Sequence, residues 1–307
     1  MKIELKKTTD PEKIKEQEWI KWILDTPIPR HLELTNKFVL ILPGSVKGGP
    51  GKSSTVITAA AGLRILGIPF LIGTYDTTND TLPNAFGKES IVILEAGDDK
   101  QTRDDLAAFK KRCVDAGAIG IIDLPGAVNN QTSVLIENLG RARILELGYL
   151  ILICPVRPDR DEIEGAYAAI EIFDPNVVLL RAWRPSRSFP NWDTFAAWKH
   201  LQKFPIWHCD NWTTSMKEVL TRSGNYARLP IVPEIPQYLA DNASTLDDVA
   251  RLDIEDVVDH LHHVAAYLYH TVLKDITRPV PGSDDGTAAT QADADEATKT
   301  LAKKTKG

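Results

Sequence analysis

Residues 44–54, GSVKGGPGKSS, decide the fold of this chain. They follow the apolar run 38–42 and precede a helix-prone stretch from Ser53 to Leu66. The usual phosphate-loop pattern, G-x-x-x-x-G-K-[ST], is not met, because Val46 stands where its first glycine would be. The variant K-G-G-x-G-K-[ST] does match. A glycine-rich loop between a strand and a helix is the setting that phosphate binding requires.

The chemistry of this loop suits a nucleotide. Glycines let backbone N–H groups converge on phosphate oxygens, and the helix N-terminus adds partial positive charge. Lys52 is expected to reach the β- and γ-phosphates, and the Ser53 hydroxyl to bind Mg²⁺. A glycine turn without a ligand is the alternative, and the coincidence of lysines, glycines and serine disfavours it. The predicted nucleotide-binding residues are Gly48, Gly49, Pro50, Gly51, Lys52, Ser53 and Ser54.

Short apolar runs alternate with longer helix-prone segments along the rest of the chain. Runs that are apolar on both faces indicate buried parallel strands, and their spacing is that of βαβ units. We therefore predict an α/β fold with a doubly wound, mostly parallel sheet and helices on both faces. The predicted strands are residues 38–42, 70–72, 91–94, 119–122, 149–153 and 177–180, with an additional edge strand at 205–207.

The flanks differ in composition from this central region. Residues 1–35 are charged and helix-prone, and they are predicted to form an N-terminal helical arm. The nucleotide-binding domain is predicted to span residues 36–277, with a late helix from Asp247 to Leu273. Residues 278–307 have few apolar side chains to bury, which predicts a disordered tail.

Composition excludes several classes of protein. The 307 residues are 43% hydrophobic and carry a net charge of −6, which suits a globular chain and leaves DNA binding through a local patch open. No apolar run approaches the ~18–20 residues that cross a bilayer, so no membrane partner is expected. The three cysteines form no C-x-x-C pair, and no signal peptide is expected, so the sequence predicts a cytoplasmic location.

The loop and the segments that follow it resemble the deviant Walker A ATPases, the family of ParA and MinD, from about Lys37 to Arg181. This resemblance implies that Lys47 reaches the nucleotide of a partner subunit, as an arginine finger does. It also implies that Asp123, at the end of the run 119–122, serves the Mg²⁺ shell. Asp76 matches the switch I aspartate linked to the attacking water, although Thr74 and Thr77 replace its usual aspartate and proline neighbours.

By this resemblance the chain is a Mg-ATP-dependent switch that forms a homodimer on ATP and hydrolyses it slowly. It would position or segregate a cargo, such as plasmid DNA or a conjugative-transfer complex of the TraL/StbB type, through a cargo or adaptor protein. An ATP-dependent metabolic ligase or synthetase on the same fold, and a non-hydrolysing ATP-binding scaffold, are the alternatives. Members of this family often have an asparagine near the position of Arg181, where it binds the adenine base. In this chain the residue is arginine.

Overall fold

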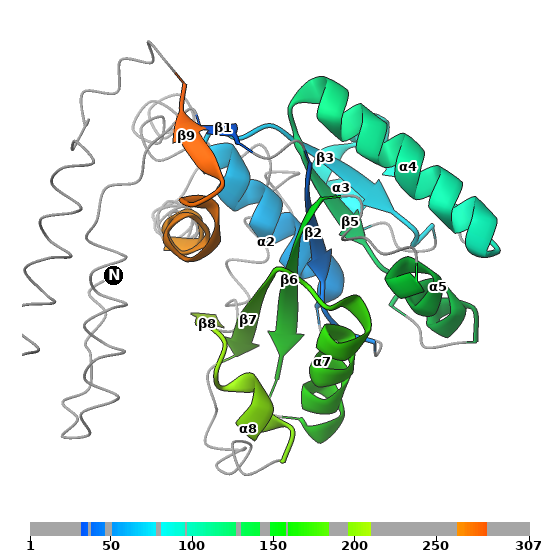
Figure 1. Ribbon diagram of the computed structural model, residues 1–307, viewed down its shortest axis with the longest axis vertical. Helices are drawn as coiled ribbons and strands as arrows, with labels where there is room; N and C mark the ends of the chain where they lie inside the picture. Colours follow the sequence, from blue (N-terminus) through cyan, green and yellow to red (C-terminus); the bar gives the residue numbers. More distant parts are fainter. Residues whose placement is uncertain are drawn as a thin grey trace, which may run out of the picture.

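The structure is a computed structural model of the 307-residue chain (Figure 1). It describes residues 32–35, 38–46, 51–77, 81–95, 97–126, 130–141, 148–157, 159–183, 196–209 and 263–280. The predicted N-terminal helix and most of the predicted tail lie outside these residues.

A seven-stranded sheet forms the centre of the molecule, in the order β4-β3-β5-β2-β6-β7-β8, and every neighbouring pair is parallel. All six predicted strands and the additional edge strand are present, which confirms the predicted α/β class. Their bounds are β2 Val39–Pro43, β3 Phe70–Thr74, β4 Ile91–Ile93, β5 Ile119–Asp123, β6 Tyr149–Val156, β7 Val177–Trp183 and β8 Ile206–Cys209.

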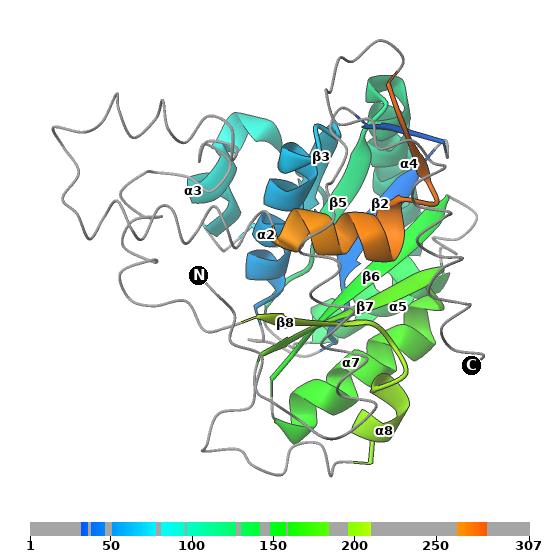
Figure 2. The same ribbon diagram turned by 90° about the vertical axis from the view of Figure 1, so that its left-hand side faces the viewer.

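Helices cover both faces of this sheet, as Figures 1 and 2 show. One face carries α2 (Lys52–Ile65), the short α3 (Thr81–Phe86) and a helical segment at 263–273, whose last turn, Tyr269–Leu273, is a π-helix. The other face carries α4 (Asp99–Ala116), α5 (Asn130–Arg141), α7 (Arg160–Phe173) and α8 (Trp198–Leu201). A 3₁₀ turn, η1 (Lys88–Ser90), leads into β4. The predicted late helix is confirmed for residues 263–273, and its earlier part lies outside the described residues.

The alternation of buried side chains along β2 explains the two layers. Val39 and Ile41 belong to the core beneath α2, whereas Leu40 and Leu42 belong to the core beneath α4, α5 and α7. A strand that is apolar on both faces is stable only between two helix layers. Consequently the carboxyl ends of the strands, where the loops begin, are the open edge at which ligands bind in such sheets.

A second, two-stranded sheet adjoins the core on the α2 face, to which Leu32 belongs. Strand β1 (Leu32–Leu34) pairs antiparallel with β9 (Thr277–Pro279), and Arg278 Nε donates to Glu33 Oε1 at 2.6 Å. The ribbon therefore takes one strand from the predicted arm and one from the junction with the predicted tail. The division of the chain at residues 35/36 and 277/278 stays a prediction.

Among the described residues, no helix has both the length and the apolar character needed to span a membrane. Cys113 and Cys154 are buried free thiols.

Candidate functional site

The junction between β2 and α2 requires glycine at two positions. A Cβ on Gly44 would lie 2.4 Å from Cys154 Sγ, so only glycine lets the chain pass β6 there. Gly51 has φ 81° and ψ 35°, in the left-handed region that glycine adopts without strain. Helix α2 then begins at Lys52, one residue before the predicted start. Lys47, Gly48, Gly49 and Pro50 lie outside the described residues, so their predicted roles stay predictions.

Lys52 is buried at the first turn of α2, with 6% of its surface exposed. Burial lowers the pKa of its ammonium, while the charges of Asp123 and Asp76 oppose that shift. A lysine held among carboxylates at a helix N-terminus concentrates positive charge where α2 already carries its positive dipole end. This is the arrangement that a phosphate group needs.

Ser53 and Asp123 form the second part of the site. Ser53 Oγ donates to Asp123 Oδ2 at 2.7 Å, joining α2 to the carboxyl end of β5. Asp123 is 1% exposed, and burial raises its pKa to about 6, with the hydroxyl of Ser53 acting against that rise. Burial therefore disfavours the ionised carboxylate, and the charge of Lys52 offsets this effect only in part.

Asp76 follows β3 and reaches the loop after β5. Its Oδ2 accepts from the Gly126 amide at 3.4 Å, and the Tyr75 amide donates to the Asp123 carbonyl at 3.2 Å. Thr74 takes part in a local turn, accepting from the Asp76 amide at 3.0 Å. Asp76 therefore lies at the same sheet edge as Asp123, close enough for its charge to help raise the pKa of Asp123.

The donor set fits a magnesium ion. Asp123 Oδ1 is buried and accepts no hydrogen bond from the described residues, so a carboxylate oxygen is available inside the site. Hydroxyl and carboxylate oxygens are the ligands Mg²⁺ prefers, and this ion keeps several waters instead of demanding a full protein cage. The described parts of the chain hold no cluster of three or more His, Cys, Asp or Glu residues that could hold a metal ion.

Arg181 belongs to the site by a contact that the sequence did not predict. Its side chain is 1% exposed, and Nη1 donates to Ser54 Oγ at 3.2 Å and to Thr55 Oγ1 at 3.1 Å. Arg181 therefore contacts the helix that follows the phosphate loop. The sequence carries no local signal for this contact, because the two hydroxyls lie 127 and 126 residues away along the chain.

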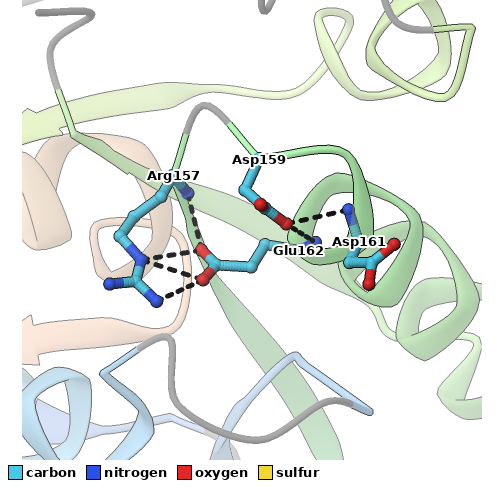
Figure 3. Close-up of polar contacts among 4 residues, drawn as sticks. All are labelled: Arg157, Asp159, Asp161 and Glu162. Carbon is cyan, nitrogen blue, oxygen red and sulfur yellow. Dashed lines mark hydrogen bonds and ion pairs between the residues drawn. The ribbon is translucent and has the colours of Figure 1, made fainter. Parts of the chain in front are cut away.

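At the neighbouring junction, between β6 and α7, the protein's own side chains cap the start of the helix (Figure 3). Asp159 caps α7 by accepting from the Asp161 amide at 2.9 Å and the Glu162 amide at 3.2 Å. Glu162, only 7% exposed, accepts from the Arg157 backbone amide and forms a bidentate pair with the Arg157 guanidinium. The acid groups of this helix start are thus already engaged by the protein.

The fold therefore assembles one group of predicted residues at one sheet edge: Gly51, Lys52, Ser53, Ser54, Asp76 and Asp123. Residues 183–212 hold five of the seven tryptophans of the chain, and the structure describes only 183 and 196–209 of this segment. Among them Trp198, the first residue of α8, is buried in the core on the α7 face of the sheet.

This combination of a parallel α/β sheet and a glycine-rich strand-to-helix loop defines a P-loop NTPase fold. No protein-family model and no curated protein matches the chain. The nucleotide-binding protein of Archaeoglobus fulgidus, solved with ADP, is similar at 15% identity and a TM-score of 0.39, covering 69% of this chain and 93% of that one. FtsY of Mycoplasma mycoides is similar at 17% identity and a TM-score of 0.37, covering 66% and 71%.

The 54 kDa signal recognition particle protein of Aeropyrum pernix, solved with GDP, is similar at 14% identity and a TM-score of 0.41, covering 81% of this chain and 55% of that one. At such low identities and TM-scores, the assignment of the fold rests on the sheet topology and on the loop between β2 and α2.

Proposed function

We propose that this chain is a Mg-ATP-dependent molecular switch that dimerises on ATP and hydrolyses it slowly. The observation that carries the proposal is the meeting of Lys52, Ser53 and Asp123 at the start of α2, where the Ser53 hydroxyl lies 2.7 Å from the Asp123 carboxylate. A buried lysine, a hydroxyl and a buried carboxylate at a helix N-terminus are the groups that bind a nucleotide phosphate together with a divalent cation.

Each residue has a distinct role in this proposal. Lys52 and the first amides of α2 bind the β- and γ-phosphates, while Ser53 and Asp123 hold the cation. Bound Mg²⁺ would neutralise negative charge on the phosphate oxygens. Asp76, tied to the loop after β5 through the Gly126 amide, orients the attacking water.

Two parts of the proposal rest on the resemblance to the deviant Walker A ATPases. Lys47 acts on the nucleotide of a second copy, so neither site is complete in a monomer. A cargo or adaptor protein binds the dimer, with plasmid DNA or a conjugative-transfer complex as the leading cargo. The buried free thiols Cys113 and Cys154 are compatible with a reducing cytoplasm.

The Lys47→Ala variant tests the switch. It should still bind Mg-ATP through Lys52, but it should lose ATP-induced dimerisation and hydrolysis together, because one charge is missing from both shared sites. By analogy with arginine fingers supplied in trans, the loss of rate should be roughly 10³- to 10⁵-fold. Light scattering with a non-hydrolysable ATP analogue measures the dimer, and phosphate release at several protein concentrations measures the rate.

Three other outcomes would redirect the assignment. A Lys47→Ala variant that dimerises and hydrolyses normally would contradict the switch and favour the metabolic ligase or synthetase. A wild-type protein that dimerises on ATP without releasing phosphate would identify the scaffold, which the replacement of the usual aspartate by Thr74 favours. Parallel titrations with Mg-ATP and Mg-GTP decide the base, and preference for GTP would overturn the ATP assignment.

A further inference from the structure

Arg181 stands on a strand in the interior of the sheet and points to the α2 face. Strand β7 runs to Trp183, and within it Arg181 is paired with Pro155 of β6 and Trp207 of β8. Two residues earlier, Leu179 packs in the core beneath α2, and alternation along the strand places Arg181 on that same face. Its guanidinium is therefore enclosed between the sheet and the first turn of α2.

The contacts of this guanidinium form a short relay to the phosphate loop. Nη1 carries two N–H groups, which suit its two acceptors, the hydroxyls of Ser54 and Thr55 at 3.2 and 3.1 Å. Thr55 Oγ1 in turn donates to the Gly51 carbonyl at 2.9 Å. The last glycine of the loop is thus connected to β7 through Thr55.

The Ser54 and Thr55 hydroxyls differ in how they use their protons. A hydroxyl has one proton and two lone pairs, and the proton of Thr55 is used on Gly51. Ser54 Oγ accepts from Arg181, and within the described residues it donates to no acceptor, so its proton is available to an external oxygen. A hydroxyl that accepts from a cation is polarised and becomes a stronger donor, the more so at low local dielectric.

We infer that Arg181 is a positioning residue for nucleotide binding, which holds the first turn of α2 and polarises the Ser54 hydroxyl for donation to a phosphate oxygen. This inference rests on the proposed function. It gives the site a second cation, Arg181, in addition to Lys52. The inference also explains why an arginine is buried here at 1% exposure. Burying its charge costs free energy that an apolar side chain would not cost, so the guanidinium is expected to have a function.

The test compares the affinity for Mg-ADP, by isothermal titration, of wild type, Arg181→Met, Arg181→Lys, Ser54→Ala and the double variant Arg181→Met/Ser54→Ala. Arg181→Met should weaken binding on the order of tenfold, the scale of one hydrogen bond to a charged group. Arg181→Lys, which keeps a charge and three donors, should recover part of the loss. The losses of affinity in the double variant should add only in part, because Arg181 acts through the Ser54 hydroxyl and also, through Thr55, on the Gly51 carbonyl.

Controls separate this inference from the proposed function. Arg64→Met removes an exposed arginine from the same helix and should leave the affinity unchanged. If Arg181→Met does not fold by circular dichroism, Arg181→Gln replaces it. Wild type that fails to bind Mg-ADP would overturn the proposed function and this inference together. Binding that Lys52→Met weakens but Arg181→Met leaves unchanged would overturn the inference alone, as would losses of affinity that add in full in the double variant.

Discussion

Helices α2 and α7 both begin where neighbouring parallel strands end, but their first turns are built in opposite ways. Helix α7 is capped by the Asp159 side chain and carries Asp161 and Glu162 in its first turn. Helix α2 starts after Gly51 with no side-chain cap and no acidic residue, and its first residue is the buried Lys52. The positive end of the α7 dipole is neutralised by the acidic side chains of that helix. The positive end of the α2 dipole has no such side chain and can bind an anion.

Helix α4 extends the same contrast. Asp98 caps it by accepting from the Gln101 amide at 2.8 Å, and Asp99 occupies its first turn. Position at a strand's carboxyl end is therefore not enough to predict a ligand site. What distinguishes α2 is that a nearby cation and the carboxylate for a metal come from other elements, Arg181 from β7 and Asp123 from β5.

Lys52→Met should produce the largest effect, on ligand affinity. Loss of a charge-assisted contact of about 1.5–3 kcal/mol would weaken Mg-ATP binding roughly 10- to 150-fold. The stability of the unliganded protein should change less than the affinity, because burial disfavours the charged ammonium while the charges of Asp123 and Asp76 favour it. Isothermal titration and urea unfolding measure the two quantities. The matched control is Lys100→Met in the first turn of α4, which is exposed; equal losses of affinity in both variants would contradict the contrast between α2 and α4.

Asp123→Asn should stabilise the unliganded protein while abolishing the Mg²⁺ dependence of nucleotide binding. The pKa of Asp123 is about 6 in the fold against 3.8 for an ordinary aspartate, so the folded state holds the proton longer than the unfolded state. Stability of the wild type therefore falls as pH rises from about 4 to 6, and the variant, whose amide does not ionise, escapes that fall. A shift of about two pKa units corresponds to roughly 2–3 kcal/mol at pH 7.

Urea unfolding of both proteins in EDTA between pH 4 and 8 measures this difference. The gap in the free energy of unfolding should be widest above pH 6 and close near pH 4. Asp104→Asn, at an exposed site on α4, should follow the wild-type curve. Parallel curves for wild type and Asp123→Asn would mean that the Asp123 carboxylate is not destabilised by burial.

Asp159→Ala should have the smallest effect, and on stability alone. Removing an N-cap aspartate costs about 1 kcal/mol, because the Asp161 and Glu162 amides lose their acceptor. Mg-ATP affinity should not change, because α7 binds no phosphate in this proposal. Thermal unfolding measures the stability and isothermal titration the Mg-ATP affinity, with Asp104→Ala at an exposed site as the control. Weakened nucleotide binding in Asp159→Ala would show that the two helix starts do not act separately.

The apolar runs of the sequence predicted every strand of the large sheet, because strands buried on both faces carry their signal within a few consecutive residues. The ends of strands were harder to predict. The apolar run 177–180 stops before Arg181, whereas β7 extends to Trp183, and this extension turns Arg181 inward toward α2. Its contacts are with hydroxyls 126 and 127 residues away in sequence, and no local pattern encodes such a partner.

The ribbon of β1 and β9 was missed for a related reason. Each strand has three residues, and β9 ends in a proline, so neither shows a period long enough to recognise. Asp123, by contrast, was predicted at the end of β5, because an acid that follows an apolar run stands out from its neighbours.

The same ribbon has a consequence for the order of folding. Glu33 and Arg278 are 245 residues apart, and closing a chain loop of that length from the unfolded state costs roughly 5 kcal/mol of entropy. Three paired residues on each side cannot repay that cost, so the ribbon forms only after β2 and the segment 263–276 have docked on the core. The Thr35 amide, which donates to the Ile276 carbonyl at 2.9 Å, should then exchange its hydrogen whenever that segment detaches, well before the sheet opens.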